Sequence, residues 1–263
     1  MDYSAVEETF IDLSLRAGSL ILDAFNAPEI ETSWKDDGSP VTAADLAADE
    51  LIREGLKQAF PGTLVVSEEN SGSHAGSASR FFLVDPLDGT SGFRRRKTEF
   101  TVNIALIEDG IPVMGVVHAP AMGRHFCTDA GGKVVERSVD PEASSCRVVA
   151  RHAVSGRNNS AVRVVASRAL RSDSRMADFL KGIQVRNVEV MSSSIKFCLI
   201  AAHEADLYPR FGRTMEWDTA AGHAILRAVG GRLVRFDDRR VLEYGKPGFE
   251  NPGFIAHAPG TVV

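Results

Sequence analysis

The sequence predicts a mixed α/β fold in which helices pack against sheets, and three observations lead to it. Between Val6 and Phe60, apolar residues recur every three or four positions in two segments, which is typical of amphipathic helices. Residues 63–136 contain short β-branched and aromatic runs separated by turns, which is typical of strands. From 162 to 226, strand-like and helix-like segments alternate, which favours parallel αβ packing.

Composition limits the class of protein. The 263 residues are 44% hydrophobic and 25% charged, as in a globular protein that forms one body or two tightly joined halves. The net charge of -5 does not favour a binder of nucleic-acid polymers, which needs a basic face, and we expect no such partner. The sequence contains no apolar run of 18 residues, so it predicts no transmembrane helix. The acidic start does not resemble a secretion signal. We expect a cytoplasmic protein, with an association with the inner face of the inner membrane as the alternative. The three widely spaced cysteines predict free, structural thiols.

The first helix ends before Pro28, and a short strand at 30–35 leads into a turn at 36–40. A second helix begins at Thr42 and must end at Pro61. Thr42 and Asp45 have the spacing of a capping box, so a structural role for Asp45 is one interpretation.

The middle of the chain predicts a series of strands. A strand at 63–67 delivers Glu68 and Glu69 at its end, where adjacent acids are usually solvated. A mobile, glycine-rich link at 71–79 follows, in which we expect His74 to be exposed. The remaining strands of this half are predicted at 81–84, 100–106, 111–118, 123–127, 133–136 and 147–150.

The second half begins after a polar, broken stretch. We place a boundary at 145–160, which divides the chain into 1–150 and 151–263. Strands are predicted at 162–166, 184–190 and 205–211, and helices at 173–181, 195–205 and 217–226. Asp218 falls in the first turn of the last helix, where it could serve as a cap, and we expect His223 to pack inside.

The stretch from Asp85 to Thr90 carries the strongest chemical signal. Asp85 and Asp88 follow a buried strand on a turn that Pro86 and Gly89 make stiff and tight. Magnesium prefers oxygen ligands and commonly takes one or two carboxylates plus a substrate phosphate. The alternative is an ordinary turn in which the acids bond only to the local backbone.

Four motifs in order resemble the inositol monophosphatase superfamily of magnesium-dependent, lithium-sensitive phosphatases. They are Asp45 in its Thr-Ala-Ala-Asp context, Glu68-Glu69, the stretch 85–90, and Trp217-Asp218-Thr219-Ala220-Ala221-Gly222. The resemblance implies a layered αβαβα sandwich. It also implies hydrolysis of a phosphomonoester by water, with two or three Mg²⁺ ions and no covalent intermediate.

The resemblance also implies a role for each site residue. One ion would take Glu68, Asp85 and the Leu87 carbonyl, and the other would take Asp85, Asp88 and Asp218. Glu68 and the Thr90 hydroxyl would orient the attacking water, and Asp45 would be an outer ligand or an acid just behind the ligands. The N–H groups of Gly89 and Thr90 would cradle the phosphate.

Longer segments resemble the 3'(2'),5'-bisphosphate nucleotidase branch of the superfamily. They lie at 93–106, 115–120 and 193–218. This branch hydrolyses adenosine 3',5'-bisphosphate, a by-product of sulfate assimilation, to AMP. Ser194 and Lys196 would then contact the second phosphate or the ribose, although Lys196 could also be a plain surface lysine. The chain departs from the branch at Ser91-Gly92, Ser192 and Arg213, which would border the substrate.

Alternatives remain for the substrate and for the class of protein. A small phosphorylated molecule is the expected partner, and an inositol or sugar phosphate is the closest rival to the nucleotide. A catalytically silent, metal-binding regulatory protein is the rival from another class. The basic run at 94–97 is either a solvated face or an attractor of anionic substrate. The expected assembly is a monomer or a homodimer.

Overall fold

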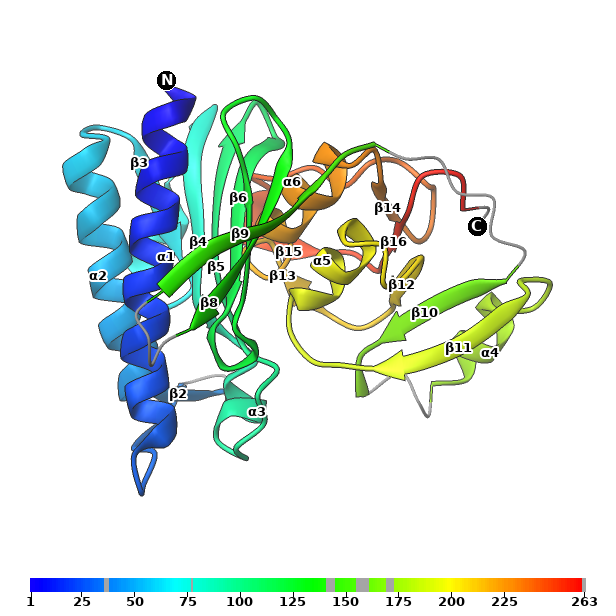
Figure 1. The fold of residues 1–263 in the computed structure, drawn as a ribbon, viewed down its shortest axis with the longest axis horizontal. Coiled ribbons are helices and arrows are strands. Elements are labelled where there is room, and N and C mark those ends of the chain that lie inside the picture. The colour runs from blue at the N-terminus through cyan, green and yellow to red at the C-terminus, as the bar shows by residue number, and fades with distance from the viewer. Residues whose placement is uncertain (36–37, 77, 141–144, 155–160, 169–172, 262–263) are drawn as a thin grey trace.

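Helices and sheets alternate in five layers (Figure 1). The computed structural model describes residues 1–35, 38–76, 78–140, 145–154, 161–168 and 173–261. From one side to the other, the layers are a helix pair, a seven-stranded sheet, a second helix pair, a five-stranded sheet and one short helix. This is the αβαβα arrangement that the sequence predicts. Parts of the predicted turn at 36–40, of the 71–79 link and of the polar stretch before 160 lie outside the described residues.

The outer helix pair consists of α1 (Tyr3–Asn26) and α2 (Ala43–Ala59). Their apolar stripes face the large sheet, where Phe10 and Ile52 are fully buried. Thr42 and Asp45 form the predicted capping box at the start of α2. A small hairpin between the two helices pairs β1 (Thr32–Trp34) with β2 (Pro40–Thr42). The end of α1 and the hairpin therefore lie next to the start of α2.

The large sheet has the order β3-β4-β5-β6-β7-β8-β9. Its strands are β3 (Leu64–Ser67), β4 (Arg80–Asp88), β5 (Thr101–Glu108), β6 (Ile111–Ala119), β7 (Arg124–Thr128), β8 (Val134–Asp140) and β9 (Ser145–His152). β3 and β4 run parallel and every later pair is antiparallel. Both faces are covered: Phe82 and Val84 pack toward α1 and α2, and Phe81 and Leu83 toward the middle layer. The period of two explains why β4 is apolar almost throughout.

The middle layer consists of α5 (Ile195–Ala201) and α6 (Ala220–Ala228). Every residue of α5 is buried, because the two sheets enclose it. The two helices approach closely at Gly222, where an added Cβ would lie 2.3 Å from the Phe197 ring. α6 begins at Ala220 with Thr219 as its cap residue, so the prediction that Asp218 caps this helix is wrong.

The second sheet has the order β11-β10-β12-β16-β14. Its strands are β10 (Val162–Ala166), β11 (Val185–Val190), β12 (Leu207–Arg210), β14 (Arg232–Arg235) and β16 (Phe254–His257). β10 pairs in parallel with β11 and β12, as the alternating pattern predicts, but β16 is antiparallel to both of its neighbours. The short helix α4 (Ser174–Phe179) covers the outer face through Met176.

The remaining elements are short. α3 (Thr90–Phe93) follows β4, β13 (Thr214–Met215) pairs with β15 (Glu250–Asn251), and 3-10 turns lie at η1 (Ser71–Ala75), η2 (Pro120–Met122) and η4 (Pro247–Phe249). None of the helices in the described ranges is long and apolar enough to cross a bilayer.

β9 forms one edge of the large sheet and carries an irregularity. Arg137 pairs with Val148 and Glu136 with Ala150, so Val149 is an extra residue without a counterpart on β8. Val148 and Val149 are about half exposed, at 48% and 47%. β9 extends to His152, two residues past the predicted division between the two halves at 150. The division itself stays a prediction.

The cysteines are free, as predicted, with Cys127 and Cys198 buried. Cys146 lies exposed on β9, so the expectation of structural thiols is wrong for this one.

Candidate active site

Three carboxylates from distant parts of the chain converge at the ends of β3 and β4. Glu68 follows β3, Asp85 lies near the end of β4, and Asp218 precedes α6. One carboxylate oxygen of each lies within 4.8 Å of the others. The structure thus brings together three of the four carboxylates that the resemblance assigns to metal ions.

Asp85 lies at the centre of this cluster. It is 1% exposed, and its Oδ1 accepts a hydrogen bond from the Leu87 amide at 3.1 Å. Its Oδ2 is buried and has no hydrogen-bond partner among the residues that the structure describes. Burial, followed by the negative charges of Glu68 and Asp88, raises the pKa of Asp85 well above its usual value. A buried carboxylate oxygen without a partner is costly unless a cation neutralises it.

Asp88 and Asp218 complete the acidic side of the site. Burial, opposed by Lys196, raises the pKa of Asp88 to about 6. Burial and the charge of Asp88 raise the pKa of Asp218 well above its usual value, while the Met215 amide donates to its carboxylate at 2.7 Å. These carboxylates are buried away from water and repel one another. Such an arrangement is typical of a site that binds cations.

Lys35 lies beside this cluster, and the sequence motifs did not predict a place for it in the site. Its ammonium is 2.8 Å from Glu68 Oε1 and 2.8 Å from Glu69 Oε1. Burial and the neighbouring Glu68 charge raise the pKa of Glu69 to about 7, against the opposing effect of Lys35. The lysine follows β1, so the hairpin brings a positive charge to the acid pair.

Asp45 and Thr90 form a hydrogen-bonded unit behind the cluster. The Thr42 amide donates to Asp45 Oδ2 at 2.8 Å, and the Thr90 hydroxyl lies 3.0 Å from both Asp45 Oδ1 and the Leu87 carbonyl oxygen. Asp45 therefore caps α2 and also accepts a hydrogen bond from Thr90, so its structural role is confirmed and its role behind the metal ligands stays a prediction.

Gly89 is required at its position for a conformational reason. Its φ is +96°, which side-chain-bearing residues rarely adopt, and an added Cβ would lie 3.1 Å from the Glu99 carbonyl oxygen. The chain can turn sharply between Asp88 and Thr90 only with glycine here.

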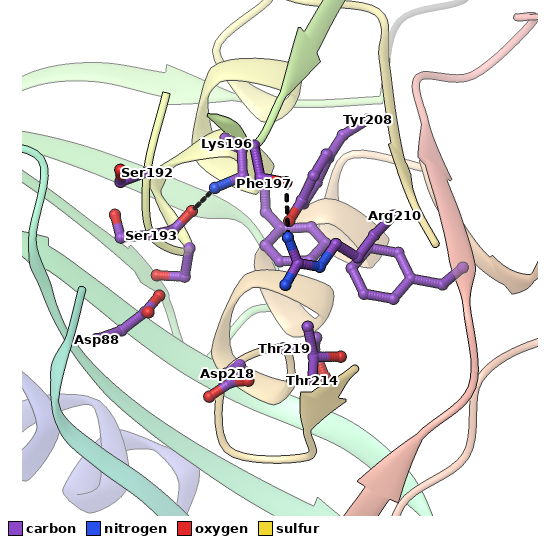
Figure 2. A pocket seen from close by; sticks show the side chains of 13 residues that line it. Asp88, Ser192, Ser193, Lys196, Phe197, Tyr208, Arg210, Thr214, Asp218 and Thr219 are labelled. Atoms are coloured by element: carbon purple, nitrogen blue, oxygen red, sulfur yellow. Dashed lines mark hydrogen bonds between the residues drawn. The ribbon is translucent and has the colours of Figure 1, made fainter. Parts of the chain in front are cut away.

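A cavity of about 190 Å³ opens next to the acids (Figure 2). Asp88 and Asp218 form one side, and Lys196, Tyr208 and Arg210 form the other. The cavity therefore has an acidic end and a basic end.

Lys196 is 2% exposed, so the alternative of a surface lysine is wrong. Burial lowers the pKa of Lys196 to about 8, although the Asp88 charge opposes the shift. Its ammonium donates to the Ser193 carbonyl and lies 4.9 Å from the centre of the Tyr208 ring.

Arg210 donates to Ser167 Oγ at 2.6 Å and to the Arg213 carbonyl at 3.1 Å. Its Nε is buried without a hydrogen-bond partner in the described part of the chain. The guanidinium is thus held at the wall of the cavity by two hydrogen bonds from its terminal nitrogens.

Ser194 lines the cavity, but its hydroxyl is directed into the interior. The hydroxyl donates to Asn103 Oδ1 at 2.6 Å and lies 2.8 Å from Thr101 Oγ1. The Ser194 backbone lowers the pKa of Asp88, against the larger effect of burial. A substrate contact of Ser194 stays a prediction.

One further prediction for the surroundings is wrong: His74 is partly buried against Trp217 and not exposed. In the basic run, Arg95, Arg96 and Lys97 are exposed, which agrees with a solvated face. Arg96 also donates to carbonyls at the end of α1, and Arg94 lies over Trp34. Attraction of anionic substrate by this run stays a prediction. His223 packs inside, as expected, with its Nδ1 3.0 Å from the Tyr244 hydroxyl.

Sequence reasoning missed Lys35, Arg210 and His74. A period-two pattern in β12 could have indicated Arg210, because it shares a face with Tyr208. No local pattern indicates the contacts of Lys35 with Glu68 or of His74 with Trp217, since both depend on the tertiary arrangement of the segments that carry these residues.

The residues present suit a hard divalent cation. All the donors are oxygens, they are close together, and the buried Asp85 Oδ2 needs a positive partner. Such an oxygen-only set favours magnesium, calcium or manganese over zinc or copper.

Comparisons with known proteins show the family to which the chain belongs. A model of the inositol monophosphatase family matches residues 2–260. The protein named 3'(2'),5'-bisphosphate nucleotidase CysQ from Salmonella typhimurium is 39% identical over 250 residues, which cover 94% of this chain and 97% of the relative. The protein of the same name from Escherichia coli K12 is 38% identical over 245 residues, covering 92% and 95%.

Solved structures show the same arrangement. The structure of CysQ from Bacteroides thetaiotaomicron, a bacterial member of the inositol monophosphatase family, superposes with a TM-score of 0.80 at 33% identity and covers 99% of both chains. An inositol monophosphatase from Anabaena superposes with a TM-score of 0.72 over 98% of this chain and 92% of its own, at 21% identity. The second likeness is one of fold alone.

Proposed function

The chain belongs to the inositol monophosphatase family, and we propose that it is a 3'(2'),5'-bisphosphate nucleotidase that hydrolyses adenosine 3',5'-bisphosphate to AMP and phosphate. The names of its relatives with 38–39% identity support the substrate, because these relatives match almost the whole chain. The family membership that the sequence motifs predict is confirmed.

The two-ended cavity is the observation that carries the proposal. Acids at one end suit a phosphate bound through metal ions, and the Lys196 ammonium with the Arg210 guanidinium at the other end suits a second phosphate (Figure 2). A substrate with one phosphate, such as an inositol monophosphate, would place no anion beside these two cations. A bisphosphate nucleotide satisfies both ends.

We assign Mg²⁺ as the metal, with two or three ions per site. Glu68, Asp85, Asp88, Asp218 and the Leu87 carbonyl would hold it. When bound, Mg²⁺ would acidify the attacking water and neutralise charge on the phosphoryl oxygens.

The chain's own groups would position the water and the phosphate. Asp45 or the Leu87 carbonyl takes the hydrogen of the Thr90 hydroxyl, so the lone pairs of Thr90 remain free to accept a hydrogen bond from water. Glu68 would hold the water from the other side. The tight turn at Gly89 would direct the N–H groups of Gly89 and Thr90 toward the phosphate.

A phosphate-release panel tests the proposal. We expect the purified protein with Mg²⁺ to hydrolyse adenosine 3',5'-bisphosphate with a kcat/KM at least tenfold above that for inositol 1-phosphate or fructose 1,6-bisphosphate. Faster hydrolysis of either rival would assign the protein to the sugar-phosphate phosphatases. No turnover of any substrate would favour the silent regulatory protein.

Matched substrates test the basic end. We expect Lys196→Met and Arg210→Met to lower kcat/KM for adenosine 3',5'-bisphosphate by about 10- to 100-fold, because each removes a charged hydrogen bond. Hydrolysis of 3'-AMP, which lacks the 5'-phosphate, should change much less. Equal losses on both substrates would contradict a role in binding the second phosphate.

The location and the assembly remain predictions. We propose a cytoplasmic protein that is a monomer or a homodimer, and light scattering of the purified protein would distinguish the two states.

A further inference from the structure

The 3-10 turn η1 holds the backbone that leads into Glu68. The Ser67 amide donates to Ser73 Oγ at 3.2 Å, and His74 Nε2 lies 2.8 Å from the Ser67 carbonyl oxygen. Because a carbonyl oxygen only accepts, His74 Nε2 carries the hydrogen of this bond. Two residues of one turn thus fix the peptide groups on both sides of the Ser67 Cα.

The same histidine ring contacts the segment that carries Asp218. His74 and Trp217 stack with their ring centres 4.9 Å apart and an angle of 26° between the planes. Trp217 is 5% exposed and also packs against Phe249, at 6.0 Å between ring centres. The indole therefore cannot move far without disturbing the core, and Asp218 is the next residue.

His74 thus connects Ser67 and Trp217, the residues that directly precede two acids from opposite halves of the chain. Their carboxylates repel each other, and the Glu68 charge contributes to the raised pKa of Asp218. Without a restraint, this repulsion would favour separation of the two acids. A cation would then have to bring them back together, and part of its binding free energy would be lost to that ordering.

We infer that His74 is a positioning residue that presets the distance between Glu68 and Asp218 and thereby strengthens binding of the divalent cation. The inference rests on the proposed function, in which these acids are metal ligands. Its two physical parts are the hydrogen bond to Ser67 and the stacking on Trp217. They can be removed separately.

Calorimetric titration of the metal-free protein with MgCl₂ or MnCl₂ tests this directly. We expect His74→Ala to raise the dissociation constant by about 10-fold or more, as for residues that orient metal ligands. His74→Phe keeps a flat ring and loses the donor, whereas His74→Gln offers a donor and loses the ring. Each should raise the constant by a smaller factor than His74→Ala. Ser71→Ala, at an exposed position of the same turn, is the matched control and should bind as the wild type does.

Fluorescence gives a second readout. The protein has two tryptophans, so a Trp34→Phe background leaves Trp217 as the only emitter. Addition of Mg²⁺ should change the Trp217 emission in this background, and His74→Ala should shift the half-point of that change to higher Mg²⁺. A merely structural role would lower the melting temperature but leave the metal dissociation constant unchanged.

The outcomes separate this inference from the proposed function. A dissociation constant within twofold of wild type in a folded His74→Ala variant would overturn the inference, even if the enzyme hydrolyses the bisphosphate. If His74→Ala does not fold, wild-type binding by both His74→Phe and His74→Gln would overturn it. Failure of the wild type to hydrolyse the bisphosphate would overturn the proposed function, while the titrations would still decide the role of His74.

Discussion

Asp88 shows how one residue can favour activity and oppose stability. Its carboxylate lies at the acidic end of the cavity, and burial raises its pKa to about 6. A carboxyl group whose pKa is raised on folding stabilises the protein below its unfolded pKa and loses that contribution as pH rises through the folded pKa. Between about pH 4 and pH 6, the charge on Asp88 should therefore destabilise the metal-free protein increasingly.

We expect Asp88→Asn to produce opposite effects on activity and on stability. Turnover with Mg²⁺ should fall more than about 100-fold, because a metal ligand is lost. In EDTA at pH 7.5, the variant should be more stable than wild type by an amount on the order of 2 kcal/mol. This difference in stability should vanish near pH 4, where the Asp88 side chain of the folded wild type is protonated and therefore uncharged, like the asparagine of the variant. Urea unfolding at several pH values measures it, and a difference that is independent of pH would contradict the assigned cause.

At the scale of single residues, the acids of the site could be predicted from the sequence, but the residues that contact and support them could not. Glu68, Asp85 and Asp218 converge as the motifs imply, since strand ends and helix starts place carboxylates in fixed directions. Lys35 and His74 escaped prediction because their contacts are made by loops with no period of their own. Lys196 was recognised, but its burial depends on two sheets that enclose α5, which no local pattern reports.

Among the elements, the pair α5 and α6 positions the residues that the second half of the chain brings to the site. α5 carries Lys196, and Asp218 precedes α6 by two residues. Their close approach depends on Gly222, where an added Cβ would lie 2.3 and 2.6 Å from two atoms of the Phe197 ring. The ring is 1% exposed and cannot turn outward.

We expect Gly222→Ala to destabilise the protein by about 1–3 kcal/mol, the usual range for overpacking a core. Because the helices must separate, kcat/KM should also fall as Lys196 and Asp218 move apart. Gly131→Ala is the control: this glycine lies in an exposed turn, and an added Cβ would meet only a carboxylate oxygen of Asp129, at 3.3 Å. Thermal unfolding and kinetics of both variants measure the effect. Wild-type behaviour of Gly222→Ala would show that the helices can adjust.

Element prediction was most complete where periodicity is long. The periodic stripes of α1 and α2 gave both helices, and the runs at 81–84 and 100–118 gave the central strands. Strands β14 and β16, after residue 226, were not predicted. Their length alone does not explain this, because β3 and β12 also have four residues and were predicted. The antiparallel direction of β16 follows from its place between β12 and β14, which the alternation of helices and strands does not encode.

Over the whole molecule, one core joins the two sheets. Phe81 and Leu83 of the large sheet share a buried cluster with Ile225 of α6 and with Val165 and Phe254 of the second sheet. The clustered acids of the site also come from both halves. Unfolding of either half should therefore remove both the core and the metal site.

We expect thermal unfolding in a single transition that Mg²⁺ shifts upward. At a concentration about 100 times its dissociation constant, a bound ligand adds about 2.7 kcal/mol. For a chain of this size, that corresponds to an increase in Tm of about 5–10 °C. Sodium chloride at equal ionic strength is the control and should have little effect. Two separate transitions, of which only one responds to Mg²⁺, would contradict the single core.

The extra residue in β9 has a consequence for the behaviour of the protein at high concentration. A regular outer strand with exposed valines presents free N–H and C=O groups on which a neighbouring copy could assemble into fibrils. At Val149, the hydrogen-bonding pattern of the strand is interrupted, and Arg147 and Arg151 add positive charge on either side. The same irregularity that leaves two apolar side chains half exposed thus protects the outermost strand from self-association.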